Sequence, residues 1–161
     1  GHDAARFAKN LVRGSKIAQS AGAGYDGTLR GEAMFMFDGQ PAEGRTVAEL
    51  EAALRAELKR VQDEGVSPEE LARVKTQTIA SQVYKRDSMM AQAMEIGGLE
   101  AAGHKWQDID KLLEKIRGDT AEEVQAVAKK YFTDDALTVA VLDPLPLDQA
   151  KPKKSAPATR H

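Results

Sequence analysis

Cysteine is absent from this sequence of 161 residues, and aromatic side chains make up only 5% of it. Without cysteine, the chain forms neither disulfides nor thiolate metal sites. The absence does not indicate a cellular compartment, because many exported proteins also lack cysteine. The length is sufficient for one domain with a single core.

Long apolar runs and an excess of one charge sign are also missing. No apolar run of the sequence approaches the roughly 18 to 20 residues that a membrane-spanning helix needs. The 23 basic and 25 acidic residues are interspersed and give a formal net charge of -2. No broad basic field therefore attracts nucleic acid or anionic lipid. We expect neither nucleic acid nor a membrane as a partner.

Histidine is scarce, and its positions do not suggest a metal site. His2 follows Gly1 in what looks like the remnant of a cleaved expression tag, residues 1–2. His104 falls in a predicted loop, and His161 ends the chain. A zinc site needs converging ligands, and neither H-x-x-E-H nor its reverse occurs. We expect no metal and no cofactor within this chain.

The first part of the chain predicts a helix followed by a hairpin. Apolar spacing indicates a short amphipathic helix over Ala4–Arg13, which Gly14 ends. Strands are predicted over Ile17–Tyr25 and Glu32–Phe37, and the turn-rich residues between them suit an antiparallel hairpin. Both faces of the second strand are apolar, so we expect it to be covered on both sides or by a partner.

Glycines 22, 24 and 27 match the spacing G-x-G-x-x-G of a dinucleotide site. Such a site needs the glycines to end a strand and open a helix. Here they lie within a predicted strand, and another strand follows. We therefore interpret the motif as part of the hairpin.

After a predicted loop over Asp38–Arg45, the apolar period becomes helical. Capping signals and apolar stripes predict successive helices that begin at Thr46, Ser67, Asp87–Ser88, Ile109 and Thr120. Carboxylates recur along these helices, and we expect most of them to face water beside basic neighbours: Glu49, Glu57, Glu64, Glu95 and Glu114. No catalytic pair or nucleophile set is discernible among them.

Residues Leu137–Leu142 form a β-branched apolar run that predicts a buried strand. The proline- and lysine-rich residues 144–161 predict a disordered tail. Strands before and after a long helical block indicate an α+β fold, with an antiparallel sheet packed against helices. Three strands are few for so many helices, so we expect the domain to be truncated at its N-terminus or completed by another chain.

Three stretches in order resemble the C-terminal domain of the insulinase/pitrilysin (M16) zinc metallopeptidases. Residues 5–20 are similar to an S-R-L-Y…L-V-R helix and the strand after it. Residues 46–75 include Gly65-Val66-Ser67-Pro68-Glu69-Glu70-Leu71, which resembles an E-G-V-[ST]-x-E-E-L signature. Residues 119–139 resemble the closing V-T-x-E-D-V…Y…N-L-T-V segment. The resemblance implies a partial domain over residues 3–143.

In this family the zinc motif lies in a preceding domain, so the resemblance implies a non-catalytic half that encloses polypeptide substrates. Whether this chain is an enzyme by itself stays open. The resemblance also implies an Arg…Tyr pair that reaches towards substrate; Arg13 falls on the arginine and Ser20 on the tyrosine. A guanidinium there would hydrogen-bond a substrate carbonyl, although serine is too short for the tyrosine's task. The alternative for Arg13 is a helix-end cation.

Several interpretations remain open at this point. The chain is a substrate-enclosing part of a zinc endopeptidase, with a catalytic M16 domain or subunit as partner and zinc in the parent protein. Alternatively, it is a non-catalytic scaffold of the same fold, or a peptide-binding module that uses a free sheet edge. A homodimer that covers an unpaired edge is also expected. The compartment is left open between bacterial periplasm and cytoplasm.

Overall fold

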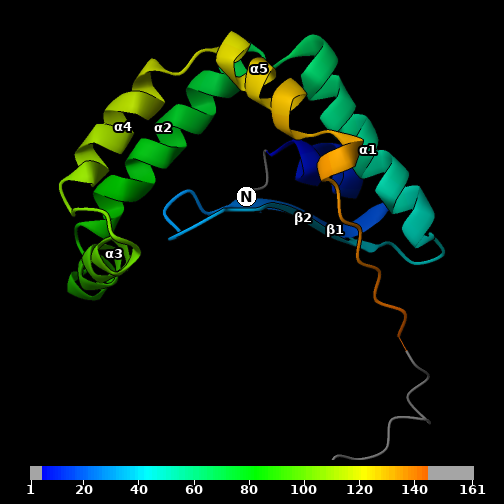
Figure 1. The fold of residues 1–161 in the computed structure, drawn as a ribbon. Helices are drawn as coiled ribbons and strands as arrows, with labels where there is room; N and C mark the ends of the chain where they lie inside the picture. Colours follow the sequence, from blue (N-terminus) through cyan, green and yellow to red (C-terminus); the bar gives the residue numbers. More distant parts are fainter. Residues whose placement is uncertain (1–4, 145–161) are drawn as a thin grey trace, which may run out of the picture.

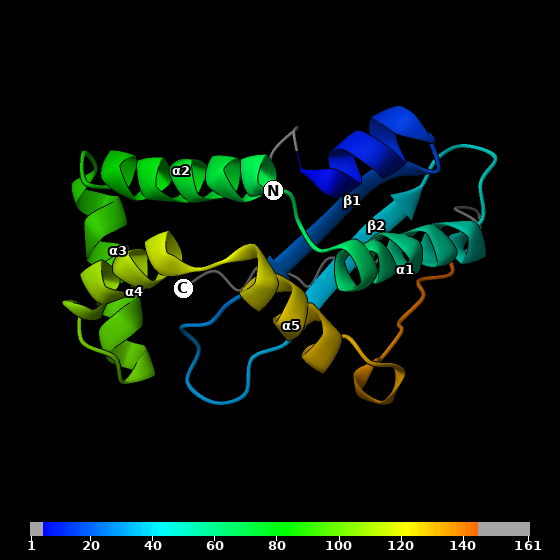
Figure 2. The ribbon, with the colours of Figure 1, turned by 90° about the horizontal axis from the view of Figure 1, so that it is seen from above.

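An arch of helices stands over a small antiparallel sheet in the computed structural model, which describes residues 5–144 (Figures 1 and 2). The sheet contains two strands, β1 (Ala18–Tyr25) and β2 (Phe35–Pro41). The remaining elements are η1 (Ala8–Gly14), α1 (Val47–Glu64), α2 (Pro68–Lys85), α3 (Met89–Ala102), α4 (Asp108–Gly118), α5 (Ala121–Tyr131) and η2 (Asp134–Ala136). The predicted α+β class is confirmed. The predicted tag remnant and tail lie outside the described residues, apart from Pro144.

The hairpin forms as predicted, with Ala23 opposite Phe37 and Tyr25 opposite Phe35. Its turn begins where the Asp26 carboxylate accepts hydrogen bonds from the backbone N–H (3.0 Å) and hydroxyl (2.6 Å) of Thr28. This local bond favours a turn over continued pairing. The glycines of the dinucleotide-like motif therefore lie in a strand and its turn, and no helix follows them.

The observed bounds of β2 differ from the predicted strand over Glu32–Phe37 and from the predicted loop over Asp38–Arg45. Pairing begins at Phe35, because β1 ends opposite it, and continues to Pro41. Gly39 explains part of the extension: a Cβ there would lie 3.0 Å from the Leu50 side chain of α1. The missing side chain lets α1 lie directly on the strand at this point.

The core lies where η1, β1 and α1 meet, and it is small. Leu11, Ala18 and Leu50 are almost fully buried, at 4%, 3% and 3% exposure. Phe37 and Phe132 close one side in an edge-to-face contact with ring centroids 5.5 Å apart. Such aromatic pairs add to the free energy gained from area burial. The aromatic side of β2 thus faces the helices.

Two glutamines join α1 to α5. The Gln62 side chain donates to the backbone oxygens of Ala128 (3.2 Å) and Phe132 (2.8 Å). In return, the Gln125 side chain donates to the oxygens of Gln62 (2.8 Å) and Asp63 (3.1 Å). These bonds serve carbonyl groups at two helix C-termini, and the Ala128 oxygen also accepts the Phe132 N–H at 3.1 Å.

The helices α2, α3 and α4 form a second region, which we name the helical arm (Figure 1). Predicted caps are confirmed here: the Ser67 and Ser88 hydroxyls accept the N–H groups of Glu70 and Ala91. Lys75 fixes α2 to the end of α4 by donating to the Arg117 carbonyl at 2.8 Å. Burial in the arm is sparse, and α2 has no buried residue.

The predicted buried strand over Leu137–Leu142 is wrong for the described chain. These residues form no strand, and the exposed fraction of their large apolar side chains ranges from 43% at Leu137 to 87% at Leu142. A β-branched run becomes a strand only if another strand offers its backbone groups. Within residues 5–144, β1 and β2 pair with each other alone.

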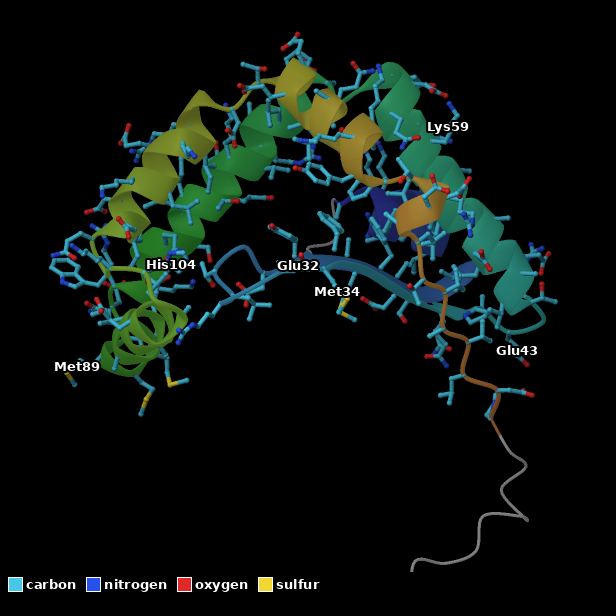
Figure 3. All side chains as sticks on the ribbon, viewed as in Figure 1. Glu32, Met34, Glu43, Lys59, Met89 and His104 are labelled. Atoms are coloured by element: carbon cyan, nitrogen blue, oxygen red, sulfur yellow. The ribbon has the colours of Figure 1, made fainter. Side chains whose placement is uncertain are left out.

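For β2 we expected cover on both sides or by a partner, and within residues 5–144 the first of these is wrong. Met34 and Met36 are 74% and 60% exposed. Figure 3 shows the Met34 side chain on the side of the sheet that faces away from the helices. The sheet is therefore covered on one face.

Candidate functional site

Arg13 lies in the last turn of η1, which is a π-helix. Its wider turn is visible in the bond from the Ser15 N–H to the Asn10 oxygen, 2.8 Å long and five residues back. Arg13 is exposed. Because it lies at the C-terminus of η1, its positive charge is favourable there. The predicted helix is confirmed in place, although its hydrogen bonding is not α-helical.

Ser20 lies in β1, is exposed, and pairs with Gln40 next to an irregularity in the strand register. Between Arg13 and Ser20 the chain turns at Lys16, whose φ of 52° is uncommon for a residue with a side chain. Directly after it, the Ile17 N–H donates to the Leu11 oxygen at 3.0 Å. Both candidate residues therefore flank a fixed turn at the buried core, and both reach the surface.

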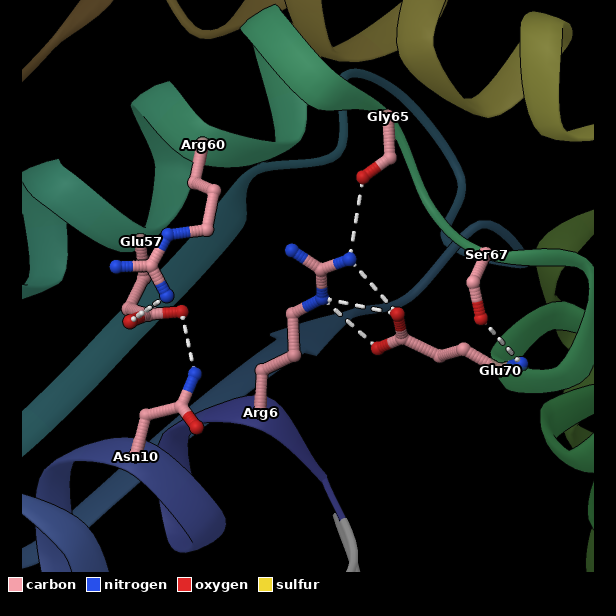
Figure 4. A network of polar contacts seen from close by, with 7 residues as sticks. All are labelled: Arg6, Asn10, Glu57, Arg60, Gly65, Ser67 and Glu70. Atoms are coloured by element: carbon pink, nitrogen blue, oxygen red, sulfur yellow. Dashed lines mark hydrogen bonds and ion pairs between the residues drawn. The ribbon is translucent and has the colours of Figure 1, made fainter.

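Arg6, just before η1, is the centre of a polar network (Figure 4). Its guanidinium donates to the Glu70 carboxylate at 2.8 and 2.7 Å and to the Gly65 oxygen at 3.1 Å. The arginine side chain is 25% exposed and the glutamate side chain 22%. A two-pronged arginine–carboxylate contact is geometrically specific, so it fixes the first helical turn against the start of α2.

The pKa of Glu70 is lowered from its ordinary value, chiefly by the hydrogen bonds from Arg6 and then by the positive charge of that arginine, with burial opposing both. The pKa of Arg6 is raised in turn, first by its hydrogen bond to Glu70. Both groups therefore hold their charges in the folded chain.

Glu57 contradicts the expectation that the helix carboxylates face water. It is 4% exposed and accepts bonds from the Asn10 side chain and from Arg60, each at 2.9 Å. A sequence signal for this burial exists, because Glu57 follows Leu50 and Leu54 at helical spacing. Burial of a charge is tolerated here because both carboxylate oxygens have partners.

A hollow of about 390 Å³ lies between η1, the end of α1 and the start of α2. Its lining includes members of both networks and mixes signs, with Arg6, Arg60 and Glu70 among its residues. The arginines and carboxylates neutralise each other, so the hollow presents no field of one sign to a ligand. We therefore assign these residues to the joining of elements.

The described residues do not fit a zinc site. Within residues 5–144, no group of three or more histidine, aspartate or glutamate side chains is placed to hold a metal ion. His104 follows the C-cap of α3 and is exposed (Figure 3). In the same part of the chain, none of the helices combines the length and the apolar character that crossing a membrane requires.

Comparison with known proteins relates the first half of the chain to a family of peptidase domains. Residues 1–78 match the family model of the peptidase M16 inactive domain, whereas no curated protein matches the sequence. The fold resembles a protease from Helicobacter pylori with a TM-score of 0.76 and 17% identity. That match covers 83% of this chain but 32% of the other, so the chain spans about a third of that protease.

Two Bordetella structures correspond over more of their length. A candidate zinc protease from Bordetella pertussis Tohama I matches with a TM-score of 0.71 and 19% identity, over 84% of this chain and 73% of the other. The inactive peptidase domain of a candidate zinc protease from Bordetella parapertussis matches with a TM-score of 0.73 and 18% identity. Here the coverage is 91% of this chain and 79% of that domain. At these identities the likeness establishes a shared fold.

Proposed function

We propose that this chain, part of which matches the inactive domain of the M16 peptidases, is the non-catalytic, substrate-enclosing part of a zinc-dependent endopeptidase. The match of residues 1–78 to the inactive-domain family carries the proposal. An inactive domain belongs to a larger protease, so its partner is a catalytic M16 domain or subunit. Zinc and the groups that act on the peptide bond would come from that partner, since the described residues offer no site for the metal.

In this proposal Arg13 contacts the polypeptide substrate. An exposed guanidinium has several N–H donors and suits a backbone carbonyl oxygen. Its attachment supports the role, because the buried Leu11 and the turn at Lys16 fix the helix end that carries it. Ser20 would contribute at most a short hydroxyl contact, since its side chain reaches less far than the tyrosine of the resembling family.

The test measures peptidase activity and zinc content of this chain, of the catalytic domain of its parent protein, and of their mixture. We expect the chain alone to be inactive and the mixture to exceed the catalytic domain alone. Arg13→Ala should lower the activity of the mixture by about tenfold, the cost of losing one hydrogen bond to a charged group. Arg30→Ala is the matched control, because Arg30 is also exposed but lies in the hairpin turn.

Two results would contradict the proposal in different ways. Zinc-dependent cleavage by this chain alone would mean that it is itself an enzyme. A parent protein without any zinc-dependent cleavage would instead support a scaffold of the same fold. Equal losses for Arg13→Ala and Arg30→Ala would remove the assigned role of Arg13 but keep the wider proposal.

A further inference from the structure

The first part of the described chain carries charges of one sign only. From residue 5 to residue 25 the sequence contains four basic residues and no acid, although acids outnumber bases by 25 to 23 in the whole chain. The four residues lie in η1 or within two residues of its ends: Arg6, Lys9, Arg13 and Lys16. The element that carries the candidate substrate contact is therefore a source of positive charge.

The two ends of η1 differ in how this charge is balanced. At the start, Arg6 donates to the Glu70 carboxylate, and Lys9 lines the same hollow as that glutamate. At the other end, the loop between β2 and α1 carries Glu43 (Figure 3). None of the ion pairs among residues 5–144 includes Lys16. Within the described residues, the charge of this exposed lysine is available to a bound group.

The backbone at Lys16 suits glycine better than lysine. Its φ of 52° lies in the left-handed region that ends many helices, where glycine is the usual residue. The conformation is fixed from the next residue on, because the Ile17 N–H donates to the Leu11 oxygen at 3.0 Å. Glycine would adopt this backbone without strain. A side chain held in a strained conformation beside a candidate site favours a role in binding over a role in stability.

Arg13 and Lys16 lie close together. Three residues of chain separate their Cα atoms by at most about 11 Å when fully extended. Here the chain turns between them, since the Ser15 N–H donates back to the Asn10 oxygen at 2.8 Å. Salt screens exposed charges over about 8 Å at physiological ionic strength. The two positive charges are therefore near enough to act on one bound polypeptide.

We propose that Lys16 gives the substrate site a preference for a carboxylate of the polypeptide, either an acidic side chain or a free C-terminus. The inference rests on the proposed function, in which Arg13 binds a backbone carbonyl, and it names the class of substrate. The planar donors of arginine suit a carbonyl oxygen, whereas the lysine ammonium is a compact charge on a flexible stem. Lys16 can therefore reach a carboxylate on a neighbouring substrate residue.

The negative end of the helix dipole does not account for Lys16. The effect of the dipole on a charge falls off beyond the last helical turn. Arg13 already supplies the basic residue of that turn, and Lys16 follows the end of η1 at Gly14. A second cation outside the helix is better explained by a ligand of opposite charge.

Matched peptides test the preference on the parent protein, which contains the catalytic domain and the whole of this domain. In one series, Glu replaces Gln at one position at a time around the cleaved bond. In a second series, a free C-terminus replaces an amide. We expect kcat/KM to be about three- to fivefold higher for the carboxylate peptide, the effect of one exposed ion pair. At about 1 M salt the preference should vanish, because the screening length falls to about 3 Å.

Three variants assign the preference to the lysine. Lys16→Gly should abolish it and keep the fold, since glycine accepts the observed φ. Lys16→Arg should retain it, because the charge remains. Lys105→Gly, at an exposed position between α3 and α4, is the matched control and should also retain it. The series that shows the preference identifies the source of the carboxylate.

The outcomes separate this inference from the function on which it rests. Equal kcat/KM within every peptide pair overturns the inference and leaves the proposed function in place. A preference that survives in Lys16→Gly also overturns it, because the lysine then has no part in selection. Absence of zinc-dependent cleavage of every peptide overturns the proposed function and the inference together.

Discussion

The region around the sheet and the helical arm differ in how their helices are stabilised. In the first region, α1 packs on β2 and α5, and η1 packs on β1, so Leu50 and Ala128 are 3% and 2% exposed. In the arm, Leu99 and Leu113 are the buried apolar residues of its described helices. The comparison shows that similar helix signals in the sequence do not imply similar packing.

Helix α3 of the arm makes the contrast clear. Met89, Met90 and Met94 are 88%, 72% and 70% exposed, although the helix has few charged residues. A helix that is apolar on most sides is normally buried. Its bounds are nevertheless well defined, because Ser88 caps its start and Gly103, with φ 89°, ends it. Local bonds thus fix the helix where tertiary packing is sparse.

The largest expected effect tests the core of the sheet region. Leu50→Ala should lower the free energy of unfolding by about 3 kcal/mol, because it removes buried methyl groups and leaves a cavity. Urea denaturation measures the change. Met94→Ala in the arm should change it by less than about 0.5 kcal/mol, as an exposed substitution does. Similar losses in the two variants would remove the distinction between the regions.

The second effect concerns the buried carboxylate that joins η1 to α1. Asn10→Ala should cost about 2 kcal/mol, since one oxygen of the buried Glu57 then lacks its partner. Gln77→Ala, at an exposed position of the arm, is the control for loss of an amide. If Asn10→Ala is harmless by urea denaturation, water must reach Glu57, and the sheet region is less tightly packed than its burial indicates.

The third prediction concerns the ion pair between the two regions. Because the pKa of Glu70 is lowered on folding, its contribution is complete above the ordinary glutamate range and is lost as the pH falls through the lowered value. Stability should therefore decline below about pH 4.5 more steeply in the original chain than in Glu70→Gln. At neutral pH the variant should lose about 1 kcal/mol.

Urea denaturation at a series of pH values measures this difference. Glu122→Gln, at an exposed position in the first turn of α5, should keep the original pH dependence. Parallel curves for the original chain and Glu70→Gln would show that the contact with Arg6 does not couple the arm to the sheet region.

The smallest expected effect lies in the arm alone. Ser88→Ala should cost about 0.5 kcal/mol, because it removes the hydroxyl that accepts the Ala91 N–H at 3.2 Å. Amide hydrogen exchange should accelerate within α3 and stay unchanged in α1. Faster exchange throughout the chain would indicate that the arm and the sheet region unfold together.

Much of the fold can be predicted because its signals are local. The capping boxes at Thr46 and Thr120 are both present, and the hairpin turn at Asp26 forms within three residues. The ends of β2 could not be predicted, since they depend on its pairing with β1. The same distinction applies to the candidate site. Arg13 and Ser20 were singled out from the resemblance, whereas the Arg6–Glu70 contact could not be predicted because the two residues are 64 positions apart.

Leu137–Leu142 separates what the sequence by itself determined from what only the tertiary structure decided. Its β-branched side chains determine an extended backbone, because dihedral preferences arise within each residue and its neighbours. Whether that backbone becomes a strand depends on another strand that supplies hydrogen bonds. Such a partner is a property of the whole arrangement in space, and the described chain leaves this segment without one.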